Sequence, residues 1–264
     1  MSICSRADFS FRPTRSPALP GSETCGEAID DLPRITQHLS GKLPPGVRRF
    51  DRMTEYPIHT RKLCAYAEFM RNWPGFENSV GVRDHVIRHL PRDIDTFREM
   101  PNGGDPAAHA TAMAIWQRRV TVQEFLSGRR LSARDRDELK KAIVPPYPLN
   151  SFPNRWWKLK KVYPSKTLMA HIGKDTYSHI HYDSRQARVI SVREAARLQS
   201  FPDGFRFCGE MNAAFRQIGN AVTPLLAWRL AEVMLSAIRN AAPKRKGAAK
   251  RTVRPNQADL FAAK

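Results

Sequence analysis

The stretch SVREAARLQSFPDGFRFCGEMNAAFRQIGNAV, Ser191 to Val222, decides how this chain is interpreted. Ser191 and Glu194 have the S-x-x-E spacing of a capping box, in which each side chain bonds a backbone N–H at the start of a helix. Small apolar side chains then share one face: Val192, Ala195, Ala196 and Leu198. Pro202 ends the helical pattern because proline cannot continue the backbone ladder. The pattern predicts a short capped helix whose small-residue face lets another backbone approach closely.

A second helix is predicted to follow a tight turn at Gln217–Asn220. Thr223 and Pro224 have the pattern of an N-cap followed by proline at the first helical position. The buried face of this helix is predicted from apolar residues at helical spacing, namely Leu226, Leu230, Val233 and Ala237. The backbone N–H groups at the Gly219–Asn220 turn could face an anionic group.

Two segments of this stretch resemble conserved blocks of the cytosine-5 DNA methyltransferases. REAARLQSFPD, Arg193 to Asp203, resembles the ninth block of that family, and RQIGNAVTPLLA, Arg216 to Ala227, resembles the tenth. Both are long and stand in the family's order and spacing. The resemblance implies an α/β fold with a Rossmann-like catalytic domain, a smaller mixed α+β target-recognition domain, and a C-terminal helix that returns to the catalytic domain.

The resemblance also implies a division of the chain and roles for particular residues. Residues 1–35 would connect to a catalytic half, 36–185 would form the DNA-binding recognition domain, 186–242 would carry the two blocks, and 243–264 would be a disordered basic tail. Asn220, Ala221 and Val222 would line the pocket for S-adenosylmethionine, the cofactor that the resemblance implies. Arg193 and Glu194 would organise the recognition domain and its junction.

Composition independently indicates a polyanionic partner. The 264 residues carry a net charge of +19, for which nucleic acid is the usual partner. The mean hydropathy is −0.51, and we expect no membrane span and no secretory leader. The four cysteines are far apart in the sequence, as expected for reduced thiols of a cytoplasmic, nucleoid-associated protein. A merely sticky basic protein is the alternative.

Cations and aromatic side chains alternate between Pro145 and Gly173. Cations can bind phosphates and aromatic rings can pack on sugars or bases, so this stretch is a candidate DNA surface. The alternative is that the tryptophans fill the core while the lysines are solvated. The family has a similar element followed by Pro-Ser-x-Thr, which implicates Ser165 and Thr167. The predicted DNA contacts are Arg155, Lys158, Lys160, Lys161, Ser165 and Thr167.

Further elements are predicted from local patterns. We expect one or two turns of helix within Cys25–Ile35, stopped by Pro33. We expect further helices at His59–Asn72, with Thr60 as N-cap, and in two pieces around Pro91 within Val82–Glu99. We expect a turn at Pro101–Asp105, short helices over 106–146 with capping boxes at Thr121 and Ser132, and a strand at Gln186–Ile190. The region 106–146 is either a sequence-reading surface or a simple helical insert.

Two short patterns suggest ligands. His171, His179 and His181 invite a metal interpretation, but no carboxylate or thiolate completes a ligand set, so we assign no metal. Gln257, Leu260 and Phe261 resemble the Gln-x-x-Leu-Phe peptide by which bacterial proteins bind the sliding clamp. Five-residue matches also arise by chance.

The resembled family uses a Pro-Cys-Gln nucleophile, a Phe-x-Gly-x-Gly cofactor loop and a Glu-Asn-Val acid, and this sequence contains none of them. We therefore assign no catalytic residue and expect no activity from the chain alone. It could be the C-terminal subunit or fragment of a split methyltransferase whose N-terminal half supplies the nucleophilic cysteine. The alternative is a truncated, inactive remnant that acts as a module binding double-stranded DNA. We favour the first.

Overall fold

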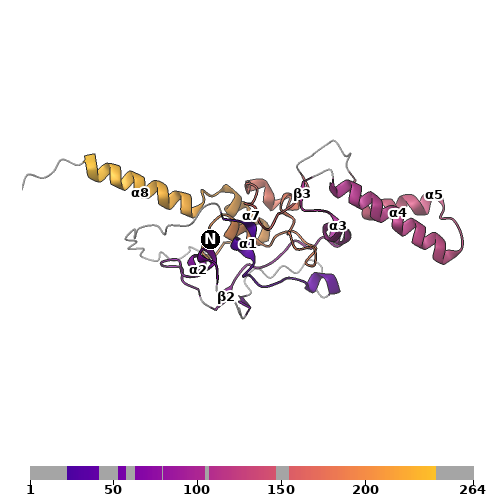
Figure 1. Cartoon of the computed structure of the whole chain (residues 1–264), viewed down its shortest axis with the longest axis horizontal. Helices are drawn as coiled ribbons and strands as arrows, with labels where there is room; N and C mark the ends of the chain where they lie inside the picture. The colour runs from indigo at the N-terminus through magenta and orange to yellow at the C-terminus, as the bar shows by residue number, and fades with distance from the viewer. Residues whose placement is uncertain are drawn as a thin grey trace, which may run out of the picture. The chain divides into compact units, whose positions relative to one another are not determined.

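The computed structural model describes residues 23–41, 53–57, 63–78, 80–104, 107–146 and 155–241. The chain divides into two units, one comprising Pro17–Leu225 and the other Met1–Ser16 with Leu226–Lys264. Figure 1 shows its elements in chain order. Helices and small sheets are mixed, which fits an α/β methyltransferase-like fold.

The first described helix, α1 (Cys25–Ile29), begins at a capping box formed by Thr24 and Glu27. This T-x-x-E pair is present in the sequence, although we did not predict it. The five residues of α1 agree with the predicted one or two turns of helix before Pro33, and a 3₁₀ helix, η1 (Gln37–Ser40), follows.

The next elements differ from the helical predictions. Helix α2 (Ala65–Arg71) is capped by the Cys64 sulfur, which accepts from the Ala67 N–H, so the helix starts later than the predicted His59; Thr60 lies outside the described residues. A small antiparallel sheet pairs β1 (Thr54–Glu55) with β2 (Gly81–Val82). Residues 83–90, predicted as helix, are irregular, because their backbone bonds go to other segments, as when the Val192 N–H donates to the Val86 carbonyl.

The core of the larger unit forms where the next segments meet. Pro91 opens η2 (Pro91–Asp93), and α3 (Ile94–Glu99) follows it. The glycines of the predicted Pro101–Asp105 turn form β3 (Gly103–Gly104), which pairs antiparallel with β4 (Trp157–Lys158). The core cluster here consists of Phe97, Met100, Ala108, Trp156, Ile180, Ala187 and Val189. Val189 reaches Ile180 by an isolated bridge, so the predicted strand Gln186–Ile190 is reduced to that single pairing.

Helices α4 (Ala107–Ser127) and α5 (Ala133–Ile143) form a hairpin, whose two helices lie side by side in Figure 1. The capping box predicted at Thr121 is wrong: α4 runs through this residue, and its hydroxyl donates to the Gln117 carbonyl. No proline or glycine interrupts 107–127, so the helix continues to Gly128. The box at Ser132 is confirmed as an N-cap, where the hydroxyl accepts from the Asp135 N–H at 3.1 Å.

The C-terminal helices follow two 3₁₀ turns, η3 (Ala170–Gly173) and η4 (Tyr177–His179). They are α6 (Val192–Leu198), α7 (Met211–Asn220) and α8 (Pro224–Ala241). Helix α7 packs closely on η3 at Gly219, where an added Cβ would lie 2.4 Å from the Met169 carbonyl oxygen. The stretch Met211–Asn240 is, by length and composition only, apolar enough to cross a membrane, contrary to our expectation from the sequence; it comprises two separate helices.

Candidate functional site

The capping box predicted at the start of α6 is confirmed and is buried. Glu194 accepts from the Ser191 N–H at 2.7 Å, and Ser191 accepts from the Glu194 N–H at 3.0 Å. Arg188 adds a bidentate pair to the same carboxylate at 2.6 and 2.7 Å. Burial alone would raise the pKa of Glu194, but the charge and hydrogen bonds of Arg188 outweigh it and lower the pKa well below its usual value. Glu194 is therefore a charged structural anchor.

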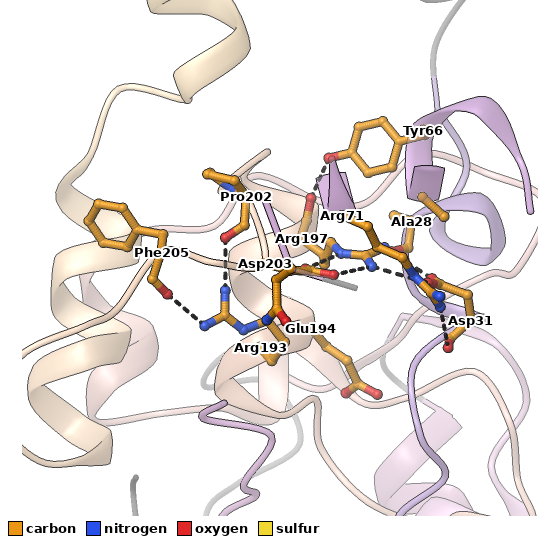
Figure 2. A network of polar contacts seen from close by, with 12 residues as sticks. Ala28, Asp31, Tyr66, Arg71, Arg193, Glu194, Arg197, Pro202, Asp203 and Phe205 are labelled. Atoms are coloured by element: carbon orange, nitrogen blue, oxygen red, sulfur yellow. Dashed lines mark hydrogen bonds and ion pairs between the residues drawn. The ribbon is translucent and has the colours of Figure 1, made fainter. Parts of the chain in front are cut away.

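Arg193 holds the chain segments on either side of α6 together. Its guanidinium donates to the carbonyls of Arg83, Pro202 and Phe205 at 2.9, 3.0 and 2.8 Å, and it pairs with Asp84. Figure 2 shows the bonds to Pro202 and Phe205. Because these segments are up to 110 residues away in sequence, this one side chain fixes a junction within the larger unit. This position agrees with the organising role that the resemblance implied, which stays a prediction.

Arg197 forms a second buried network. It bonds the Asp203 carboxylate at 2.5 and 2.6 Å, the Asp31 carboxylate at 3.0 Å, and the Ala28 carbonyl at 3.0 Å. Asp31 also accepts from Arg71 at 2.7 Å, which links α2 to the network in Figure 2. Neither Arg197 nor Asp203 was predicted to have a role. Their one signal in the sequence was their place within Arg193–Asp203, the segment that resembles the ninth block.

The histidines near α6 are buried and neutral. Burial lowers the pKa of His179 to about 4 and that of His181 to about 3. His181 lies 3.7 Å from the Glu194 carboxylate, whereas His171 is exposed. Within the described segments, no three His, Cys, Asp or Glu side chains form a group that could hold a metal ion.

The residues predicted to line the cofactor pocket lie together where α7 ends. Asn220 is the exposed last residue of α7, Ala221 is half-buried and Val222 is exposed. The predicted Gly-Asn turn at the start of a helix is wrong, because Gly219 and Asn220 continue α7 and α8 begins at Pro224. The end of a helix presents carbonyls, so the argument for an anion facing its backbone N–H groups fails.

Helix α6 positions this edge through its C-terminal residues. The Gln199 amide donates to the Ile218 carbonyl at 3.2 Å, and the Ser200 hydroxyl accepts from the Leu225 N–H at 3.1 Å. The edge offers an exposed amide beside an exposed apolar side chain, and such groups fit one side of a nucleoside-containing ligand. The remaining walls of a binding site would have to come from elsewhere.

The structure separates the predicted DNA contacts into available and unavailable groups. Lys158 is wrong as a phosphate contact: it is 0% exposed and donates to the carbonyls of Phe97 and Met100 and to the Ser184 hydroxyl at 2.7, 3.0 and 2.6 Å. Burial lowers its pKa to about 8. A buried amine with three acceptors is a structural group.

The other predicted contacts lie nearer the surface. Arg155 pairs with Asp175 at 2.9 Å, and Lys161 pairs with Asp30 at 2.6 Å. Lys160 is exposed near the Tyr163 ring. Ser165 is half-buried and Thr167 is exposed. Trp156 lies in the core, whereas the Lys166 ammonium lies over the ring of Trp157. One tryptophan therefore fills the core, as one alternative for this stretch had it, while several cations stay at the surface, as the DNA-surface alternative requires. Gln257, Leu260 and Phe261 lie outside the described residues.

Comparison with known proteins finds relatives that share part of this sequence. Residues 109–236 match the family model for C-5 cytosine-specific DNA methylases. A putative type II methyltransferase of Oceanobacillus iheyensis is 39% identical over 213 residues, which is 80% of this chain and 44% of the relative. A type II methyltransferase of Bacillus paralicheniformis is 30% identical over 217 residues, or 81% of this chain and 41% of the relative.

A DNA (cytosine-5-)-methyltransferase of Aeropyrum pernix is 44% identical over 75 residues, which cover 28% of this chain and 16% of the relative. The chain is therefore similar to the cytosine-5 DNA methyltransferases, over residues 109–236 in the family model and over about four-fifths of its length in the first two relatives. It spans less than half the length of the first two relatives.

Proposed function

We propose that this chain is the C-terminal half of a DNA (cytosine-5)-methyltransferase. It recognises duplex DNA and completes the S-adenosylmethionine site, while an N-terminal half supplies the nucleophilic cysteine. The cofactor supplies the methyl group when bound. In this chain, Asn220, Ala221 and Val222 would hold one side of it, and no described residue here is given a catalytic role.

The observation that carries the proposal is the uncovered apolar face of α8. Its exposed large apolar residues recur at helical spacing, namely Leu226, Leu230, Val233, Met234 and Ile238. The prediction that Leu226, Leu230 and Val233 are buried is wrong, because each is at least half exposed. Arg229, Glu232, Ser236 and Arg239 occupy the other side of the helix. An exposed apolar stripe of this kind marks an interaction surface. A complementary methyltransferase half, with an apolar surface beside the cofactor, fits this face.

Methyl transfer from tritium-labelled S-adenosylmethionine to duplex DNA tests the proposal. The chain alone should transfer nothing, and addition of a half that carries Pro-Cys-Gln should restore transfer. Leu230→Asp with Met234→Asp should abolish assembly, whereas Ser236→Asp on the polar side of α8 should leave it intact. Transfer by the purified chain alone, or assembly that ignores the double substitution, contradicts the proposal.

The cofactor edge has its own test. Asn220→Ala in the assembled enzyme should weaken S-adenosylmethionine binding, measured by calorimetry, and leave DNA binding by the chain unchanged. Cofactor binding of equal strength in the variant removes Asn220 from the site.

The alternative is that the chain acts as a DNA-binding module without a partner half, in which case the chain alone should bind duplex DNA. The net charge of +19 favours such binding. Neutralised phosphates release counterions, so the affinity should fall steeply between about 50 and 200 mM salt. Binding that is insensitive to salt contradicts this part of the proposal. Tritium transfer on addition of the partner half distinguishes the module from the enzyme subunit.

A further inference from the structure

The outer end of the α4–α5 hairpin carries exposed apolar side chains beside two arginines. We call this surface the hairpin tip and define it as Val122, Phe125, Leu126, Arg129 and Arg130. Phe125 is 85% exposed and Leu126 is 77% exposed. Adjacent large apolar residues this open at a helix end are unusual on a soluble surface and indicate contact with a partner.

The inner part of the hairpin has an apolar core of its own. Ala112 and Ile115 of α4 pack with Ile143, the last residue of α5, and with Val144, which follows it. Beyond Trp116, no residue of α4 from Gln117 to Ser127 is buried. At 1.5 Å per residue, these eleven residues extend about 16 Å. This length exceeds the depth of either groove of B-DNA, about 8 Å, so the tip could reach into a groove.

Charges along the hairpin separate its inner part from its tip. Arg118 and Arg119 pair with Glu99 and Asp95 of α3, and Arg134 pairs with Glu138 at 3.1 Å. Arg129 and Arg130 have no ion-pair partner among the residues that the structure describes. Two adjacent exposed arginines without carboxylate partners favour an anionic surface.

The tip is also held in a fixed conformation. Gly128 has a φ of 65°, the left-handed conformation that ends α4 and reverses the chain. Glu124 accepts from the Leu131 N–H at 3.0 Å and pairs with Arg136 of α5, so one carboxylate fastens both sides of the turn. A preorganised tip loses little conformational entropy on binding.

We propose that the hairpin tip is a wedge for duplex DNA. Arg129 and Arg130 contact phosphates, while Phe125 and Leu126 enter a groove and partly unstack a base step, which bends the duplex. Apolar wedges flanked by cations act on DNA in this way. The proposal rests on the proposed DNA-binding function and adds a bending contact, at residues within the region 106–146 that the sequence left open as a sequence-reading surface or a helical insert.

Fluorescence energy transfer between the ends of a 30-base-pair duplex tests the wedge, with the full chain as the binding protein. Binding of the original chain should raise the transfer as the duplex bends. Phe125→Ser with Leu126→Ser should return the transfer to the level of free DNA and weaken binding about tenfold, of the order of one stacked contact. Val80→Ser, at an exposed apolar residue outside both the hairpin and the stretch Pro145–Gly173, is the matched control and should change neither value.

The arginines are tested by the salt dependence of binding to the same duplex. Arg129→Ser with Arg130→Ser should reduce the slope of log affinity against log salt by about 1.8, because two phosphate contacts are lost. Arg134→Ser, on the same hairpin but paired and 87% exposed at its side chain, should reduce it far less.

The outcomes separate the two proposals. If the chain binds DNA but the tip variants bind and bend it equally well, the wedge is refuted and the proposed function stands. If the original chain binds no duplex, the DNA-binding function fails and the wedge fails with it. If the tip variants lose a protein partner while bending is unchanged, the tip is a protein interface and the wedge is again refuted.

Discussion

Replacement of Arg197 by methionine should destabilise the larger unit severely. Arg197 is fully buried, and its loss removes both hydrogen bonds to the Asp203 carboxylate, at 2.5 and 2.6 Å. Asp31 keeps its bonds to Arg71 at 2.7 and 3.1 Å, but Asp203 keeps only the Tyr56 hydroxyl as a side-chain hydrogen-bond donor among the described residues. Breaking a buried ion pair from one side costs about 3–5 kcal/mol, out of a typical total of about 5–15 kcal/mol.

The free energy of unfolding in urea, followed by circular dichroism, measures this cost. Asp203→Asn added to Arg197→Met should restore more than half of the loss, because the orphaned charge is then removed. Arg197→Lys, which keeps the charge but not the fork of donors, should cost less than Arg197→Met. Arg134→Met is the surface control, and its exposed pair should cost under about 0.5 kcal/mol.

The loss should also depend on pH in a defined direction. Burial would raise the pKa of Asp203, but Arg197 overrides it and the pKa is lowered. The ionised carboxylate therefore stabilises the original protein above the unfolded pKa of about 3.9, and this contribution is lost as the pH falls through the folded pKa. Without Arg197, burial is opposed only by the charge of Arg193 and the hydrogen bond of Tyr56, so the pKa of Asp203 should rise and the cost of the substitution should be larger near pH 8 than near pH 5.

The reasoning is refuted if Arg197→Met costs less than about 1 kcal/mol, or if the double variant loses the sum of both single losses. A cost that is independent of pH would show that lost packing, and not the uncompensated carboxylate, explains the effect.

Three further tests address other parts of the structure. His179 and His181 have folded pKa values of about 4 and 3, below the unfolded value near 6.5. The stability that they contribute should therefore be full above a pH of about 6.5 and should fall on acidification by up to about 1.4 kcal/mol per pH unit for each histidine. His179→Gln should reduce this slope in urea titrations. Lys158→Met should lower the free energy of unfolding by about 2 kcal/mol, because it leaves buried acceptors unsatisfied, and should not change the dependence of DNA affinity on salt. Lys160→Met should change that salt dependence and leave the stability unchanged. Gly219→Ala should lower the melting temperature by overpacking, at a cost of about 1–3 kcal/mol, because its Cβ meets backbone; an unchanged melting temperature would contradict the close approach of α7 to η3.

Local patterns in the sequence predicted the elements whose bonds are local. The capping box of Ser191 and Glu194 spans three residues, and both halves of it form. Thr121 shows the limit of that reasoning, because a capping pattern inside an uninterrupted helix-forming stretch is overridden by the helix itself. The Gly-Asn turn was misplaced for the same reason, since α7 continues through Gly219.

Partners that are distant in sequence decided what the patterns could not. Lys158 stands in a basic, aromatic stretch that looks suited to DNA, but carbonyls 58 and 61 residues away capture its ammonium. The sequence also could not show which carboxylates face Arg197, because Asp31 is 166 residues away. Arg193 was singled out in advance by the resemblance alone, because no local spacing points to its distant partners.

The separation of Asp31 from Arg197 has a consequence for synthesis on the ribosome. Translation at about 5–20 residues per second needs roughly 8–33 s to make the intervening 166 residues. During that interval, the carboxylate and the apolar face of α1 have no Arg197 to dock against. The larger unit can therefore complete its fold only after α6 has left the ribosome, and until then the Asp31 carboxylate lacks the Arg197 side of its buried network.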